Sequence, residues 1–156
     1  MQDYFDAANQ LWLIDNIVAR IKEYRKRNQP ILLVQYVDEA GYPLSHYLKE
    51  IVDAVEGYDK AYYVDKTDDD GGSKIDCFLE DMKLKPHIKV LEVCGVNTDA
   101  CVLETILSLT WRFYGAQIAV PLDCCDSVSG RERAIRELEE VLFDYNCPTV
   151  ELLESF

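Results

Sequence analysis

The chain has 156 residues, a length that suits one domain with a sizeable core. Hydrophobic residues make up 49% of it, and ten tyrosines and two tryptophans argue against a disordered chain. The formal net charge of −13 speaks against partners such as nucleic acid or an anionic membrane, because like charges repel.

The cysteines and histidines give little support to a disulfide framework or a metal site. Six cysteines are present, but we find no signal peptide before them, and several lie in strand-like or helical runs. We therefore expect reduced thiols in a cytoplasmic protein. Paired CxxC motifs are absent and the chain has only two histidines, so we expect no metal and no other cofactor. No apolar run is long enough to span a membrane.

Hydrophobic periodicity predicts helices and strands in alternation. Apolar residues at helical spacing from residue 13 predict a first helix that Pro30 stops, and the nearly continuous apolar run at 31–37 predicts a strand buried on both faces. The alternation predicts one α/β domain over residues 1–156, a three-layer α/β/α fold whose mostly parallel sheet has helices on both faces. The other predicted strands are 61–64, 90–95, 117–122 and an edge strand at 150–153, and other helices begin near residues 45, 75 and 129.

The stretch that points to chemistry is 89–105, KVLEVCGVNTDACVLET. A buried strand closes at Gly95, turn or capping residues come next, and apolar residues then recur at helical spacing to about Tyr114. Cys101 falls in the first turn of this helix. Unpaired N–H groups and the positive end of the helix dipole favour a thiolate there and could hold an oxyanion, so Cys101 is a candidate nucleophile. The alternative is a small buried residue that packs the helix on the sheet.

Lys66 is the second candidate, because it lies just after the end of another predicted strand. Ligands of parallel sheets bind at the carboxyl ends of the strands, so Lys66 and Cys101 could converge in one cleft. The residues after Lys66, TDDDGGS, are typical of a solvated acidic turn rather than of a metal site. The alternative for Lys66 is an ordinary solvent-exposed lysine beside this loop.

The segment GVNTDACVLET resembles the signature of the isochorismatase-like cysteine hydrolases, the superfamily that includes nicotinamidases and N-carbamoylsarcosine amidohydrolases. Residues 123–127, DCCDS, resemble the family's "Asp-Ala-x-x-Ser" loop. The segment Val64-Asp65-Lys66 resembles its catalytic lysine segment, although this match is weaker. The resemblance covers most of the chain and implies a Rossmann-like, isochorismatase-like fold.

The resemblance also implies an activity and roles for residues. The reaction would be hydrolysis of a small amide or ureido C–N bond, with Cys101 as the nucleophile that forms a thioester and Lys66 lowering its pKa. Backbone N–H groups of Asn97 and Cys101 would form the oxyanion hole, with a cis peptide before Asn97. The substrate would be a small molecule, and the protein a homo-oligomer, because relatives are commonly dimers or tetramers.

The beginning of the chain departs from the family pattern. The family starts with a strand that ends in Asp-x-Gln-x-x-Phe, and this aspartate is its general acid and base. Residues 1–5, MQDYF, match the family residues just after that aspartate, so we expect the domain to lack the family's first strand. Asp3 is a candidate for the missing acid, and a surface or capping aspartate is the alternative. The aspartate and histidines that hold metal in nicotinamidases are not rebuilt here.

Two other functions stay open at this stage. The chain could be a catalytically inactive family member that acts as a binding or scaffold protein, and the reactivity of Cys101 toward an alkylating reagent would then match that of a free thiol. A thiol redox protein that uses Cys124 and Cys125 is a weaker hypothesis, because adjacent cysteines form only a strained bridge.

Overall fold

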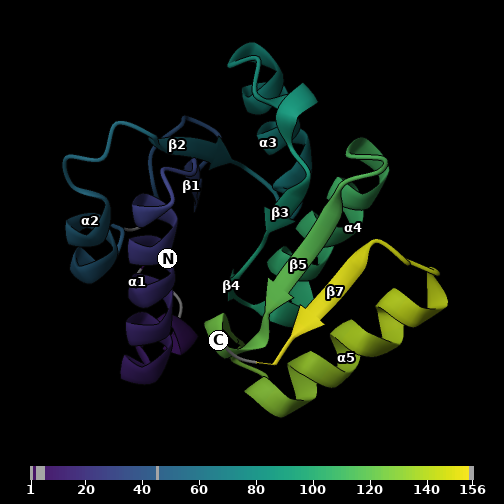
Figure 1. Cartoon of the computed structure of the whole chain (residues 1–156). Helices are drawn as coiled ribbons and strands as arrows, with labels where there is room; N and C mark the ends of the chain where they lie inside the picture. The colour runs from purple at the N-terminus through teal and green to yellow at the C-terminus, as the bar shows by residue number, and fades with distance from the viewer. Residues whose placement is uncertain (1, 3–5, 45, 155–156) are drawn as a thin grey trace.

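The computed structural model describes residues 2, 6–44 and 46–154. Its strands are all paired in parallel, as the alternation of helices and strands predicts (Figure 1). Three groups of strands are connected by hydrogen bonds, in the orders β1-β2, β3-β5-β7 and β4-β6. The strands are β1 (Ile31–Tyr36), β2 (Ala61–Lys66), β3 (Val90–Glu92), β4 (Gly95–Val96), β5 (Gln117–Pro121), β6 (Cys125–Asp126) and β7 (Val150–Leu153).

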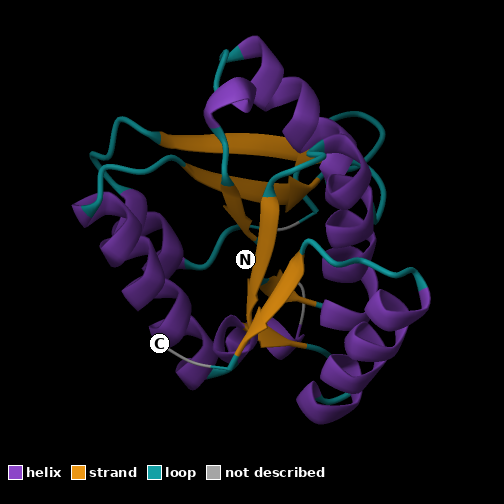
Figure 2. Ribbon diagram, turned by 45° about the vertical axis from the view of Figure 1, so that its right-hand side comes forward, coloured by secondary structure: helices purple, strands orange, loops and turns teal. Residues whose placement is uncertain are grey.

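Helices cover both faces of the strand layer, so the predicted three-layer α/β fold is confirmed (Figure 2). One group consists of α1 and α2, and the other of α3, α4 and α5. The α-helices are α1 (Leu11–Lys26), α2 (Lys49–Val55), α3 (Gly72–Asp81), α4 (Leu103–Arg112) and α5 (Arg131–Asp144). Short helical turns are η1 (Asp6–Asn9), η2 (Lys85–His87), η3 (Thr98–Val102) and η4 (Leu122–Cys124). None of the helices in the described part of the chain is long and apolar enough to cross a membrane.

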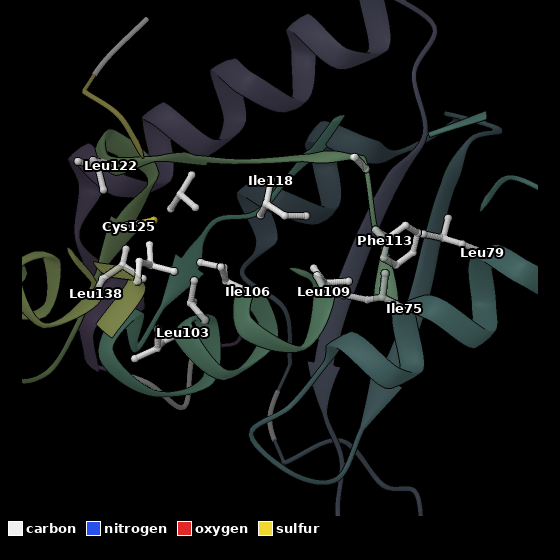
Figure 3. Packing of buried hydrophobic residues seen from close by; sticks show 14 residues of the cluster. Ile75, Leu79, Leu103, Ile106, Leu109, Phe113, Ile118, Leu122, Cys125 and Leu138 are labelled. Carbon is white, nitrogen blue, oxygen red and sulfur yellow. The ribbon is translucent and has the colours of Figure 1, made fainter. Parts of the chain in front are cut away.

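Each group of helices has its own hydrophobic cluster against the strands. The cluster under α3, α4 and α5 is centred on Ile106 and Ile118, which are fully buried (Figure 3). The cluster under α1 and α2 contains Leu13 and Ile51 together with Leu33 of β1. Burial of large aliphatic side chains on both faces stabilises the fold, by roughly 2 kcal/mol for each fully buried residue.

The strand layer is interrupted between β1 and β3. Both strands line a cavity of about 320 Å³, and no other strand in the described residues pairs with either of them on that side. The family's first strand, which we expect this domain to lack, has no counterpart there among these residues. At one end of β1 the Gln2 side chain pairs with the backbone of Tyr36: its Nε2 donates to the Tyr36 carbonyl at 3.1 Å, and its Oε1 accepts from the Tyr36 N–H at 2.7 Å.

Two helices begin at other residues than the apolar pattern indicates. The second helix begins at Lys49, four residues after the predicted start near residue 45, which lies outside the described residues. Helix α3 begins at Gly72, three residues before the first residue of its apolar face, and the Asp70 carboxylate accepts a hydrogen bond from the Gly72 N–H at 2.6 Å. These shifts leave the order of elements unchanged.

Candidate functional site

Cys101 lies in η3, a π-helical turn that precedes α4, and not in the first turn of an α-helix as the spacing predicts. Asn97 starts this turn in the left-handed conformation, with φ 58° and ψ 57°. Two side chains of the turn bind the segment after β5: Thr98 Oγ1 donates to the Asp126 carbonyl at 3.0 Å, and the Asp99 carboxylate accepts from Ser127. The cysteine turn is therefore fixed to the neighbouring loop by hydrogen bonds.

The Cys101 thiol is half-buried and donates a hydrogen bond to Asp69 Oδ1 over 3.1 Å. Burial, together with this bond to a carboxylate, raises the pKa of Cys101 to about 11. The positive charge of Lys66 acts in the opposite direction but does not outweigh them. Burial and the Asp69 contact thus favour the protonated thiol, in contrast to the thiolate that a helix N-terminus leads us to expect.

Lys66 is the last residue of β2 and is buried, with 7% of its surface exposed. Its Nζ donates to the Asp69 carbonyl oxygen at 2.7 Å and lies 5.6 Å from the centre of the Tyr36 ring. A buried ammonium group held in this way is not an ordinary surface lysine. Lys66 and Cys101 both line the cavity between β1 and β3, so the topology brings the two predicted residues to one site.

The acidic loop after Lys66 is bound to α4 rather than solvated throughout. The Gly71 N–H donates to Thr105 Oγ1 at 2.9 Å, and Ser108 Oγ donates to Asp70 Oδ2 at 2.9 Å. A Cβ atom on Gly72 would lie 2.7 Å from the Cβ and Oγ of Ser108, so only glycine allows this approach. The close packing places Asp69 beside Cys101.

Asp69 is the site residue that the sequence analysis missed. Its carboxylate contacts the thiol, and its carbonyl contacts Lys66, so one residue connects the two candidates. The aspartate run in which it lies is typical of a solvated turn. The available signal was the Gly-Gly pair directly after this run, because glycines permit close packing of a loop on a helix. The other candidate acid, Asp3, lies outside the described residues.

Asn97 and Cys101, the residues predicted to form the oxyanion hole, both lie in or next to the cysteine turn. The backbone N–H of Cys101 lowers the pKa of the thiol of the same residue. No cis peptide bond occurs among the described residues, so the cis peptide expected before Asn97 is not found. The side-chain oxygen of Asn97 is buried and has no hydrogen-bond partner in this part of the chain.

The adjacent cysteines Cys124 and Cys125 pack in different places, and Cys124 forms a hydrogen bond with Cys94. Cys124 and Cys125 are both fully buried and belong to different hydrophobic clusters, one on each face of the strand layer. Burial raises the pKa of Cys125 to about 12. Opposed, buried thiols are poorly placed for redox exchange, which needs an accessible thiolate. Among the described residues, no group of three or more His, Cys, Asp or Glu side chains is placed to hold a metal ion.

Solved structures resemble this fold over nearly the whole chain. The nicotinamidase SaPncA from Staphylococcus aureus has a TM-score of 0.65 and 24% identity, covering 93% of this chain and 88% of its own. The MAR1 ribonuclease from Caenorhabditis elegans has a TM-score of 0.71 and 17% identity, covering 97% and 72%. An isochorismatase-like hydrolase from Alkaliphilus metalliredigens has a TM-score of 0.71 and 14% identity, covering 94% and 78%. At these identities the likeness shows the fold alone.

Sequence comparison identifies the family. Isochorismatase domain-containing protein 2 from Bos taurus is 33% identical over 63 residues, or 40% of this chain and 30% of that protein. The protein of the same name from Homo sapiens is 30% identical over 63 residues, with the same shares. This chain thus matches only about 30% of the length of these relatives. The isochorismatase domain model matches residues 1–144. The chain therefore belongs to the isochorismatase family.

Proposed function

We propose that the protein hydrolyses the C–N bond of a small amide or ureido compound through a thioester on Cys101. The observation that supports this most directly is the contact of both candidate residues with Asp69: Cys101 Sγ lies 3.1 Å from its carboxylate, and Lys66 Nζ lies 2.7 Å from its carbonyl. Both line a cavity of about 320 Å³, near the lower limit for small-molecule sites.

In the proposed reaction, Cys101 Sγ attacks the substrate carbonyl carbon. The S–C bond forms as the carbonyl π electrons move to oxygen, and the N–H groups of Asn97 and Cys101 hold the resulting oxyanion. Collapse of this intermediate breaks the C–N bond, releases the amine and leaves a thioester. Water then attacks the thioester, which breaks the C–S bond and releases the acid. Lys66 favours the negative charge on sulfur through its own charge.

Two measurements test this proposal. Release of ammonia or amine is monitored for nicotinamide, N-carbamoylsarcosine and simple primary amides, and the acyl-enzyme is sought by mass spectrometry of the intact protein after rapid acid quenching. Cys101→Ser is expected to abolish both signals. Cys77→Ser, which changes an exposed free cysteine outside the cavity, is expected to keep them. Turnover that survives in Cys101→Ser would refute the thioester route.

A catalytically inactive binding protein is the second candidate, and the protonated state of Cys101 favours it. Alkylation rates alone do not separate the two functions, because a thiol with a pKa of about 11 reacts slowly with iodoacetamide in an enzyme and in a binding protein alike. The acyl-enzyme does separate them, since only a working nucleophile accumulates it.

We also propose that the protein acts in the cytoplasm as a homodimer or homotetramer. All six cysteines are free thiols, which is consistent with a reducing compartment. Large apolar side chains on the surface, among them Trp111, Tyr114 and Phe143, offer area for subunit contacts. Size-exclusion chromatography with light scattering tests the assembly, and a monomer at micromolar concentration would contradict it.

A further inference from the structure

The Asp69 carboxylate contacts the sulfur that the proposed reaction uses. Among the described residues, it is the side chain to which the thiol donates its hydrogen bond, over 3.1 Å. A proton can pass directly between two groups at hydrogen-bond distance. We propose that Asp69 is the general base and general acid of this enzyme, a role that rests on the proposed hydrolase function.

Asp69 is held in place through its own backbone and through its neighbours. Lys66 Nζ donates to its carbonyl at 2.7 Å, and Thr105 Oγ1 lies 3.5 Å from the same oxygen. Thr105 also donates to the Cys101 carbonyl at 2.7 Å, so the loop and the cysteine turn share one hydroxyl group. Next to Asp69, the Asp70 carboxylate accepts from Ser108 at 2.9 Å. These bonds hold the backbone of Asp69 in place, so its carboxylate has fewer positions to lose when it acts.

The proton passes through Asp69 in both halves of the reaction. As the sulfur attacks the carbonyl carbon, the thiol proton moves to the Asp69 carboxylate. The carboxylic acid then gives this proton to the nitrogen, the C–N bond breaks, and the neutral amine leaves. In the second half, the carboxylate takes a proton from the attacking water, and it returns that proton to sulfur as the C–S bond breaks. The net change is addition of one water across the C–N bond.

The charge of Asp69 affects the pKa of Cys101, and this effect can be measured separately from turnover. The charged and titratable groups that act on the thiol are Lys66, which favours the thiolate, and Asp69, which opposes it; the Tyr36 hydroxyl is also close enough to interact with the thiol. Loss of the Asp69 charge therefore lowers the pKa of Cys101 and increases the thiolate fraction. A residue that only supports the structure would not increase thiol reactivity while turnover falls.

The variant that tests the proposal is Asp69→Asn, which keeps the size of the side chain and removes its charge. We expect kcat to fall by about 10²- to 10⁴-fold, the usual contribution of a general acid or base. In the same variant, alkylation of Cys101 by iodoacetamide at pH 8 is expected to become faster, by about tenfold for each unit by which the pKa falls. Alkylation is measured by peptide mass spectrometry without any substrate.

Asp68→Asn is the matched control. Asp68 lies in the same loop and carries the same charge, and no hydrogen bond joins it to Cys101 in the described part of the chain. It is expected to leave both kcat and the alkylation rate within about twofold of the parent protein.

The outcomes distinguish the two proposals. If Asp69→Asn keeps its turnover while Cys101→Ser abolishes it, Asp69 is not the acid–base group and the hydrolase function stands. If both turnover and alkylation fall in Asp69→Asn, the residue has a structural role only, and the proposal is overturned. If the parent protein shows neither turnover nor an acyl-enzyme on the amide and ureido panel, the hydrolase function fails and the role of Asp69 fails with it.

Discussion

Replacement of Gly72 by alanine tests whether the close packing of the acidic loop on α4 positions the site. The new Cβ would lie 2.7 Å from the Cβ and Oγ of Ser108. Ordinary carbon contacts need about 3.5–4.0 Å, so the loop must move away from the helix by about 1 Å. Overpacking of this kind costs about 1–3 kcal/mol, and the greater helix propensity of alanine returns at most about 1 kcal/mol. We expect the free energy of unfolding to fall by about 1 kcal/mol.

The effect on turnover is expected to be much larger than the effect on stability. A shift of about 1 Å moves Asp69 away from Cys101, and misplacement on that scale costs about 10²-fold in rate. Urea denaturation and steady-state kinetics measure the two quantities. The second variant combines Gly72→Ala with Ser108→Gly, which removes the two Ser108 atoms at 2.7 Å and leaves Asp70 Oδ1 at 3.0 Å. Its kcat should lie close to that of Ser108→Gly alone, so that Gly72→Ala costs little in this background. A Gly72→Ala protein with unchanged kcat, or a pair without recovery, would refute the reasoning.

Three further predictions concern charge. Lys66→Met is expected to raise the pKa of Cys101 above about 11, since the lysine charge lowers it, and slower alkylation by iodoacetamide would show this. Arg20→Ala removes the buried ion pair with Glu92, whose atoms lie 2.8 Å apart, and urea denaturation should show that the free energy of unfolding falls by about 3 kcal/mol. Loss of the exposed ion pair of Arg27 with Glu23 should lower it by less than about 1 kcal/mol. The kcat/KM of the parent protein should be constant from about pH 6 to 9, because the Cys101 proton passes directly to the Asp69 carboxylate. If the thiol instead lost its proton to solvent before reaction, kcat/KM would rise roughly tenfold per pH unit below the pKa of the thiol.

Much of the fold can be predicted from hydrophobic patterning. The run at 31–37 forms β1 (Ile31–Tyr36), and the predicted strand at 117–122 forms β5 (Gln117–Pro121). The prediction that the first of these strands is buried on both faces is wrong: within β1 only Leu33 is buried, because the strand borders the cavity. The break between β1 and β3 is not a property of any one segment. It depends on which strands pair, and the pattern of a single strand does not encode its neighbours.

The site could be predicted only in part. Strand ends and a motif, both local features of the sequence, predict Lys66 and Cys101, and the structure brings the two side chains to one cavity. Asp69 was missed because its contact with Cys101 joins residues 32 positions apart, and the charge of the loop gave no sign that it packs on a helix. The π-helical turn at Thr98–Val102 was missed because side-chain spacing over five residues does not separate a π turn from an α turn.

The ionisation of Cys101 depends on which of several opposing effects is larger at this site. A helix N-terminus supplies roughly half a unit charge, spread over several N–H groups, and its influence falls off within one turn. Half-burial removes solvation from the thiolate, and the Asp69 carboxylate adds a full negative charge at 3.1 Å from the sulfur. Desolvation and the hydrogen bond to Asp69 together outweigh the charge of Lys66, which favours the thiolate, so the pKa of Cys101 lies above its usual value. A nucleophile in that state needs a proton acceptor at contact distance. In the proposed mechanism, the Asp69 carboxylate that raises the pKa of Cys101 is also the acceptor of its proton when the sulfur attacks the carbonyl carbon of a substrate.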